Sequence, residues 1–254
     1  MISCNLKGGI GNQLFQISTT FSLAQSNNDQ SVFNLDACYT PMQGNKASKY
    51  KDTIFKNLNI STSIVRESLY TEPIFSYTPI QYSKNLCIDG YFQSEKYFSQ
   101  YYDELLTFYN LNYKVDEIKE FLSKLPRPIT SIHVRRGDYI PFQNIVVLLD
   151  FEYYKRSMDV LKSNTYLIFS HDFEWAKEKF TSKNHVLFEF DDELMNLIAM
   201  SCCDNHIIAN STFSWWGAYL NKSKTKTIVA PTQWFNPDAN IPECDLIPPT
   251  WNRV

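Results

Sequence analysis

The chain has 254 residues, 44% hydrophobic and 15% aromatic, so it can bury a substantial core and is not intrinsically disordered as a whole. Its 24 Lys and Arg against 27 Asp and Glu give a formal net charge of -3, without the basic excess that nucleic-acid binding requires. The sequence contains no apolar run of the roughly 18 residues needed to span a bilayer and no signal-peptide pattern at its N-terminus. We therefore expect a soluble, cytoplasmic protein with no membrane span and no nucleic-acid partner.

The first half begins with a βαβ pattern. A strand is expected at 2–6, followed by a glycine-containing turn, a helix from about 13 to 25 and a second strand at 32–35. Weaker signals indicate a strand near 86–88 and an aromatic helix near 96–109.

Two prolines, Pro126 and Pro128, mark the best candidate for a domain boundary, because proline interrupts a helix. They divide the chain into an N-terminal domain (1–125) and a C-terminal domain (126–254).

The second half alternates short apolar strands with helices. The expected strands are 129–134, 166–169, 186–190, 206–209 and 227–230. The expected helices are 151–161, 173–180, 192–202 and 213–220. Strands that are apolar on both faces and separated by helices predict a parallel sheet covered on both sides. We infer an α/β architecture of two Rossmann-like domains facing a cleft, with ligands bound beyond the carboxyl ends of the strands.

The first segment that follows a predicted strand is a glycine turn. Gly9 and Gly11 allow a tight turn and the close approach of a ligand to the backbone. Asn12 can cap the following helix and leave its amides facing a ligand. A purely structural turn explains the same residues equally well.

The second segment is His133-Val134-Arg135-Arg136-Gly137-Asp138. Side chains alternate along a strand, so we expect His133 and Arg135 to share the ligand face and Arg136 to pair with Asp138. An arginine fork matches a diphosphate and supplies positive charge without a metal. The alternative is that both arginines form structural ion pairs.

The third segment runs from Asn210 to Ala218 and opens a helix. Ser211 or Thr212 is a natural N-cap, and no acidic residue follows at the capping-box position, so the helix start offers hydroxyls and amides to an anion. Trp215 and Trp216 are expected to pack in the core rather than against a substrate.

Five blocks, GGIGNQLFQ, GYFQSEKYF, HVRRGDY, FSHDFEWAK and IIANSTFSWWGAYLN, together resemble the α1,2-fucosyltransferases of bacteria and viruses. The resemblance implies a GT-B type fold, GDP-L-fucose as donor, inversion at the fucosyl carbon, a β-galactoside 2-hydroxyl as acceptor, and no cofactor or obligatory metal. It makes 1–125 the acceptor-side domain and 126–254 the GDP-sugar-binding domain. It assigns donor binding to Gly9, Gly11, Asn12, His133, Arg135, Asp172, Asn210, Ser211, Thr212, Phe213 and Ser214. Two positions depart from the expected pattern, because His171 and Asn196 stand where acidic residues are expected.

The resemblance makes a sugar nucleotide diphosphate the leaving group, so fixed positive charge near its oxygens is the main catalytic requirement. Arg135 and the helix start at 212–214 are expected to supply that charge, and Asp138 is the candidate base that deprotonates the acceptor.

Two alternatives remain. Asp191, Asp192 and Glu193 could bind a metal in a GT-A type transferase, or they could form a solvated first helical turn. The chain could also be a nucleotide- or carbohydrate-binding protein without turnover, as the departures at His171 and Asn196 would allow.

Overall fold

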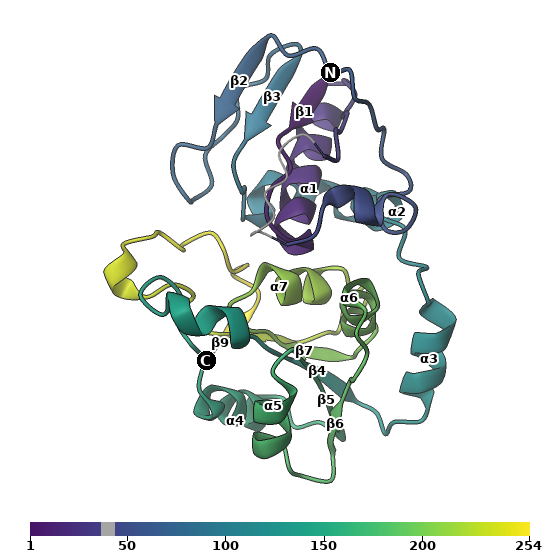
Figure 1. Cartoon of the computed structure of the whole chain (residues 1–254), viewed down its shortest axis with the longest axis vertical. Coiled ribbons are helices and arrows are strands. Elements are labelled where there is room, and N and C mark those ends of the chain that lie inside the picture. Colours follow the sequence, from purple (N-terminus) through teal and green to yellow (C-terminus); the bar gives the residue numbers. More distant parts are fainter. Residues whose placement is uncertain (37–43) are drawn as a thin grey trace. The chain divides into compact units, whose positions relative to one another are not determined.

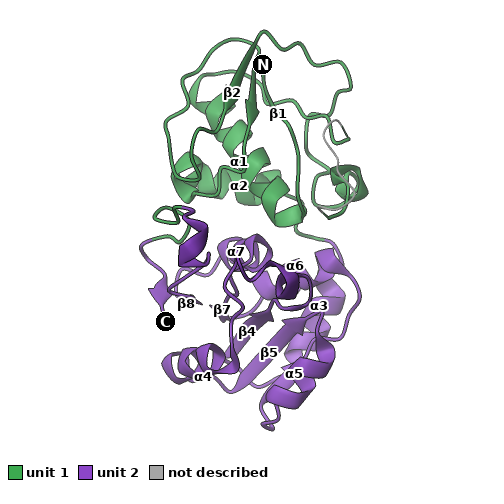
Figure 2. Cartoon of the chain, turned by 60° about the vertical axis from the view of Figure 1, so that its left-hand side comes forward, with its two compact units in different colours: residues 1–112, 242–248 green, residues 113–241, 249–254 purple. Residues whose placement is uncertain are grey.

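The computed structural model describes residues 1–36 and 44–254, which form two compact units (Figure 2). Unit 1 comprises residues 1–112 and 242–248, and unit 2 comprises residues 113–241 and 249–254. The units are therefore divided thirteen residues before the boundary that the prolines suggested, and a short C-terminal segment returns to unit 1.

Helix α3 (Val115–Ser123) accounts for the earlier boundary. Its Phe121 ring packs edge-on against Phe188 and Phe190 of unit 2, with ring centroids 5.2 and 5.9 Å apart. Helix α3 therefore belongs to the core of unit 2, although it precedes the predicted boundary between residues 125 and 126.

Unit 1 is built on a three-stranded parallel sheet of order β1-β3-β2 (Figure 1). Its strands are β1 (Ile2–Cys4), β2 (Ser68–Thr71) and β3 (Leu86–Asp89), and helix α1 (Ile10–Ser26) packs on β1. The sequence did not predict β2. The strand expected at 32–35 is wrong, because parallel pairing there is confined to isolated bridges at Ser31 and Phe33.

The aromatic helix expected at 96–109 is broken into the short turns η3 (Glu95–Tyr97) and η4 (Ser99–Tyr101) and helix α2 (Tyr102–Phe108). Phe98 interrupts it with φ -147°, and its fully buried ring lies 5.9 Å from that of Phe15 in α1. Burial of this ring therefore prevails over local helical pattern. A further turn, η2, spans Ala47–Tyr50.

Unit 2 contains a six-stranded parallel sheet of order β6-β5-β4-β7-β8-β9. The strands are β4 (Ile129–Val134), β5 (Thr165–Ser170), β6 (His185–Leu187), β7 (Asn205–Ile207), β8 (Ile228–Ala230) and β9 (Asn252–Arg253). The helices are α4 (Phe151–Val160), α5 (Phe173–Lys179), α6 (Glu193–Ser201) and α7 (Thr212–Tyr219), with short turns η5 (Gly137–Phe142) and η6 (Pro237–Ala239). The five strands and four helices predicted here are confirmed, with ends displaced by up to three residues.

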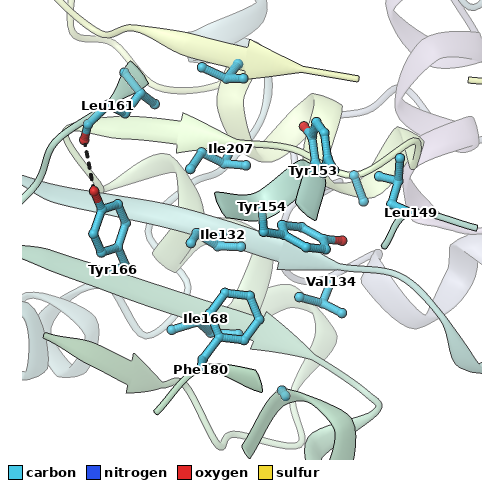
Figure 3. Packing of buried hydrophobic residues seen from close by; sticks show 13 residues of the cluster. Ile132, Val134, Leu149, Tyr153, Tyr154, Leu161, Tyr166, Ile168, Phe180 and Ile207 are labelled. Atoms are coloured by element: carbon cyan, nitrogen blue, oxygen red, sulfur yellow. Dashed lines mark hydrogen bonds between the residues drawn. The ribbon is translucent and has the colours of Figure 1, made fainter. Parts of the chain in front are cut away.

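Helices α4 and α5 cover one face of this sheet, and α6 and α7 cover the other (Figure 1). Figure 3 shows the core under α4, where Ile132, Ile168 and Ile207 of neighbouring strands meet the rings of Tyr153 and Tyr154. Burial of such side chains stabilises the fold by about 1.5–3 kcal/mol each, and it holds the strand ends in place.

The order of the strands creates a switch point between β4 and β7. From β4 the chain proceeds outward through β5 and β6, and it then returns to β7 and proceeds the other way through β8. Doubly wound sheets bind ligands in the crevice at such a point, beyond the carboxyl ends of the strands. The segments after β4 and β7 are the second and third segments singled out in the sequence. Among the described residues, no helix has the length and apolarity required to cross a bilayer.

Candidate active site

His133 is the penultimate residue of β4 and lies at the switch point. Its side chain is 3% exposed, and its ring centroid lies 5.5 Å from that of Phe213 in α7. Burial, reinforced by the electrostatic effect of Arg135 and His171, holds the pKa of His133 well below its ordinary value, so the His133 ring is neutral. Its buried Nδ1 has no hydrogen-bond partner among the described residues, which leaves one ring nitrogen for a ligand.

Arg135 follows directly after β4 and retains unfilled donors. Its Nη2 donates to Asp138 Oδ2 at 2.6 Å, and its guanidinium carbon lies 5.3 Å from the centre of the Tyr139 ring. The buried Nε of Arg135 has no partner within the part of the chain described. One end of the Arg135 guanidinium is therefore bonded to Asp138, and its Nε can donate to a further acceptor.

Arg136 points into a different environment. Its guanidinium lies 4.4 Å from the centre of the Trp175 ring, its Nη1 donates to the Leu149 carbonyl at 3.3 Å, and its Nε is 3.7 Å from Asp172 Oδ2. With the side chain only 17% exposed, these contacts fasten α5 to the end of β4.

The predicted pair between Arg136 and Asp138 is wrong, because Asp138 pairs with Arg135. The prediction extended strand alternation past Val134, where β4 ends. The backbone of Arg136 (φ -131°, ψ -77°) turns the chain into η5, and this turn brings residue 138 back to residue 135.

Asp172 is the N-cap of α5. Its Oδ1 accepts the Trp175 amide at 3.3 Å, while Oδ2 faces Arg136. Its proposed contact with the guanine base stays a prediction. The cap and the ion pair are structural roles that sequence analysis missed, although an Asp immediately before a predicted helix is an N-cap signal.

Asn210 ties together the loops at the end of β7. Its Nδ2 donates to the backbone carbonyls of Val147 at 2.7 Å and Trp234 at 2.9 Å, and the backbone carbonyl of Asn210 accepts the Tyr139 hydroxyl at 2.9 Å. Tyr139 was not predicted as a site residue, although it is the last residue of the HVRRGDY block. The structure thus joins the segment after β4 to the segment after β7.

Helix α7 begins at this junction, and of the two predicted candidates, Ser211 and Thr212, Ser211 is the N-cap. Ser211 makes no side-chain capping bond, and the first amides of any α-helix point out of its N-terminal end. The Ser214 hydroxyl donates to the Ser211 carbonyl at 3.2 Å. The partial positive charge of this helix start can therefore act on an anion.

The tryptophans of α7 are core residues, as expected. Trp215 and Trp216 are both fully buried, and the Trp215 ring lies 4.6 Å from that of Tyr219 and 5.3 Å from that of Trp251. Their packing fixes the position of the helix start.

The glycine turn of unit 1 differs from the prediction at Asn12. Helix α1 begins at Ile10 with Gly9 as N-cap, so Gly11 and Asn12 lie in its first turn and Asn12 does not cap it. Asn12 Oδ1 instead accepts from Gln93 Nε2 at 2.9 Å. Gly8 has φ +79°, and an added Cβ would lie 2.3 Å from Asn12 Nδ2, so this position requires glycine.

The acidic run 191–193 leads into α6, with Asp192 as its N-cap and Glu193 as its first residue. Asp192 Oδ1 accepts the Met195 amide at 3.0 Å, and its Oδ2 accepts from Tyr113 and Lys114 at 2.9 and 2.8 Å. Burial acts to raise the pKa of Asp192, but these hydrogen bonds and the charge of Lys114 lower it below its ordinary value. Asn196 Nδ2 binds the carbonyl of Phe190 at 2.8 Å, which gives the departure at this position a structural role.

Within residues 1–36 and 44–254, no cluster of His, Cys, Asp and Glu side chains has an arrangement that could hold a metal ion. The GT-A alternative is therefore without support in the described residues, because the capping and ion-pair contacts of Asp192 occupy both of its oxygens.

The comparison with known proteins covers the whole chain. A sequence model of glycosyl transferase family 11 matches residues 1–253. The O-antigen biosynthesis glycosyltransferase WbnK of Escherichia coli is 27% identical over 92% of this chain and 95% of its own length. An alpha-1,2-colitosyltransferase of Escherichia coli is 29% identical over 100% and 99%, and a galactoside 2-alpha-L-fucosyltransferase of Caenorhabditis elegans is 25% identical over 100% and 79%.

Solved structures of two fucosyltransferases share the fold. POFUT1 in complex with GDP aligns with a TM-score of 0.55 and 11% identity, over 90% of this chain and 96% of that one. Fucosyltransferase NodZ from Bradyrhizobium aligns with a TM-score of 0.53 and 10% identity, over 85% and 92%. The α/β fold of GT-B type is thereby confirmed.

Proposed function

The chain belongs to glycosyl transferase family 11, and from this premise we propose that it transfers L-fucose from GDP-L-fucose to an acceptor glycan. The expected acceptor group is the 2-hydroxyl of a β-galactoside, and the expected stereochemical outcome is inversion at the fucosyl carbon. The names of the relatives, one of which is a galactoside 2-alpha-L-fucosyltransferase, support this assignment.

The observation that carries the proposal is the set of anion-binding groups at the switch point of unit 2. Arg135 with its unfilled Nε, the neutral His133 with its unfilled Nδ1, and the start of α7 all lie at the ends of two adjacent strands. An arginine fork and a helix N-terminus are the groups that proteins use to bind a diphosphate. We assign the diphosphate of the donor to this edge.

The proposed chemistry follows from the charge that develops during transfer. As the bond between the fucosyl carbon and the diphosphate oxygen breaks, negative charge grows on GDP, and the guanidinium of Arg135 and the amides of α7 stabilise it. These groups would perform the role that a divalent cation has elsewhere, so we propose a mechanism without an obligatory metal or other cofactor.

Other donor contacts remain proposals. Gly9, Gly11 and Asn12 are assigned by the resemblance, as is Asp172 for the guanine base. Asp138 keeps its predicted role as base, although its ion pair with Arg135 also makes it the residue that orients the fork.

One relative favours a second candidate, transfer of colitose, which is fucose without its 3-hydroxyl. The two sugars differ by one hydrogen-bonding group. A site that pairs with this hydroxyl would reject colitose by about 10⁴-fold, whereas an apolar wall would discriminate weakly.

The test is to incubate the purified protein with GDP-fucose or GDP-colitose and a panel of β-galactosides, and to measure GDP release and product linkage. Transfer of fucose to the 2-hydroxyl supports the first candidate, and a preference for GDP-colitose supports the second. Tight GDP binding with no transfer from either donor would identify a binding protein without turnover, and the proposal would be wrong.

A further inference from the structure

A single side chain, that of Tyr139, contacts both Arg135 and the segment that leads into α7. The guanidinium carbon of Arg135 lies 5.3 Å from the centre of the Tyr139 ring, within the range of a cation–π contact. The Tyr139 hydroxyl donates to the backbone carbonyl of Asn210 at 2.9 Å, and Asn210 immediately precedes Ser211, the N-cap of α7. All of these residues belong to unit 2.

The backbone is anchored on each side of this contact. In η5 the Tyr139 amide donates to the Arg136 carbonyl at 2.6 Å. On the other side, the Asn210 side chain donates to the backbone carbonyls of Val147 at 2.7 Å and Trp234 at 2.9 Å. A hydroxyl that joins two anchored segments holds them at a fixed separation.

The chemistry of the Tyr139 hydroxyl suits this role. Burial raises the pKa of Tyr139, and the positive charge of Arg135 opposes this only in part. The hydroxyl therefore keeps its proton at neutral pH and can donate it to the Asn210 carbonyl. Tyr139 holds its neighbours in place and exchanges no proton with a ligand.

A diphosphate makes the separation of its binding groups important. Its two phosphates are joined by one bridging oxygen, so an arginine fork and a helix start can both bind it only when they lie at a matching distance. A misplacement of about 1 Å in such an arrangement can cost about 10²-fold in rate.

We propose that Tyr139 is a positioning residue that fixes the separation between the Arg135 guanidinium and the start of α7, so that both groups bind the same diphosphate. This inference rests on the proposed function, which assigns the donor diphosphate to these groups. The Tyr139 ring sets the position of the guanidinium, and its hydroxyl sets the position of the segment that precedes the N-cap.

The first experiment measures the affinities of GDP and GMP for the wild type and Tyr139→Phe by calorimetry. GDP can reach both groups, whereas GMP has one phosphate and does not depend on their separation. We expect Tyr139→Phe to weaken GDP binding by about tenfold and to leave GMP binding within about twofold of the wild type. Equal weakening of both nucleotides, or unchanged GDP affinity, would overturn the proposal.

The second experiment measures single-turnover transfer at saturating donor and acceptor. Tyr139→Phe keeps the ring and should slow transfer by about tenfold, whereas Tyr139→Leu removes ring and hydroxyl and should slow it by about 10²-fold. In an Arg135→Ala background, Tyr139→Phe should change the rate by less than about twofold, because the separation no longer matters when the guanidinium is absent. A full tenfold loss in that background would show that Tyr139 acts independently of Arg135 and would contradict the proposal.

A matched control is Tyr153→Phe, in the core under α4 (Figure 3). The Tyr153 hydroxyl is buried and donates to the Ile208 carbonyl at 2.6 Å, two residues before Asn210. Tyr153→Phe should lower the melting temperature and leave the ratio of GDP to GMP affinity unchanged. The same change of ratio in Tyr153→Phe would mean that a general loss of stability explains the result for Tyr139. Absence of transfer by the wild type would contradict the proposed function, and the nucleotide affinities would still decide the role of Tyr139.

Discussion

Replacing the two adjacent arginines that follow β4 should have different effects, because we expect Arg135 to affect the rate of transfer and Arg136 the stability of the fold. Arg135 makes one ion pair with Asp138, whose side chain is 59% exposed, so its removal should cost less than about 1 kcal/mol of folding free energy. Its proposed contact with the diphosphate acts in the transition state, and Arg135→Ala should therefore slow transfer by about 10²-fold or more.

Arg136 should behave in the opposite way. Stacking on Trp175 contributes about 1–2 kcal/mol at a site this buried, and the charged hydrogen bond to the Leu149 carbonyl contributes about 1.5 kcal/mol. Allowing for non-additivity, Arg136→Ala should lower the free energy of unfolding by about 2–4 kcal/mol. Its rate of transfer, measured below the melting temperature, should stay within a few-fold of the wild type.

The assay combines urea unfolding with steady-state GDP release for both alanine variants and for Arg135→Lys. The lysine variant should also be slow at saturating donor, because an ammonium does not reproduce the fork. Near-normal turnover by Arg135→Lys would refute the assigned role. An unstable Arg135→Ala beside a stable but inactive Arg136→Ala would mean that the two arginines have been assigned in reverse.

Three further predictions concern metal, base recognition and pH. Transfer should survive EDTA, and complete loss that added Mg²⁺ or Mn²⁺ restores would contradict the metal-free mechanism. GDP should inhibit more strongly than ADP or UDP, because guanine presents two adjacent donors to a carboxylate. Asp172→Asn should erode that preference while leaving the N-cap of α5 in place, because Asn caps a helix about as well as Asp, and equal inhibition by all three nucleotides would refute a guanine-specific site. Burial, with Lys226 nearby, lowers the pKa of His206 from 6.5 to about 3, so below about pH 6.5 protons bind the unfolded chain in preference to the folded one. The free energy of unfolding should fall by up to about 1.4 kcal/mol per pH unit from this group as pH drops toward 3, and urea titrations of His206→Gln should lack that contribution; an unchanged pH dependence would show that His206 does not cause it.

The sheet of unit 2 could largely be predicted because central strands such as β4, β5 and β8 are buried on both faces and therefore read as short apolar runs. The two-residue strand β9, whose residues are exposed, was not predicted. The strand β2 of unit 1 could not be predicted either, because it lies at the edge of its sheet and its residues Leu69 and Thr71 are exposed. Its four residues carry a weak pattern, and the neighbour that holds it in place is fifteen or more residues away in sequence.

The candidate site was predicted better in its location than in its contacts. Sequence analysis placed Arg135 and Ser211 after the ends of two predicted strands, and the structure adds that these strands, β4 and β7, are neighbours at the switch point. The partner of Asp138 depends on backbone angles beyond the end of β4, which alternation along a strand does not describe.

The return of residues 242–248 to unit 1 bears on how members of this family could exchange parts. Asp245 accepts from Ser76 Oγ at 2.7 Å and from the Tyr77 amide at 3.0 Å, and it pairs with Lys96. A chimaera joined once, near residue 112, would combine the N-terminal portion of one enzyme with the C-terminal segment of another and would mismatch these contacts. Recombination that preserves both units therefore needs three junctions, near residues 112, 241 and 248, so that the short returning segment travels with the N-terminal portion it braces.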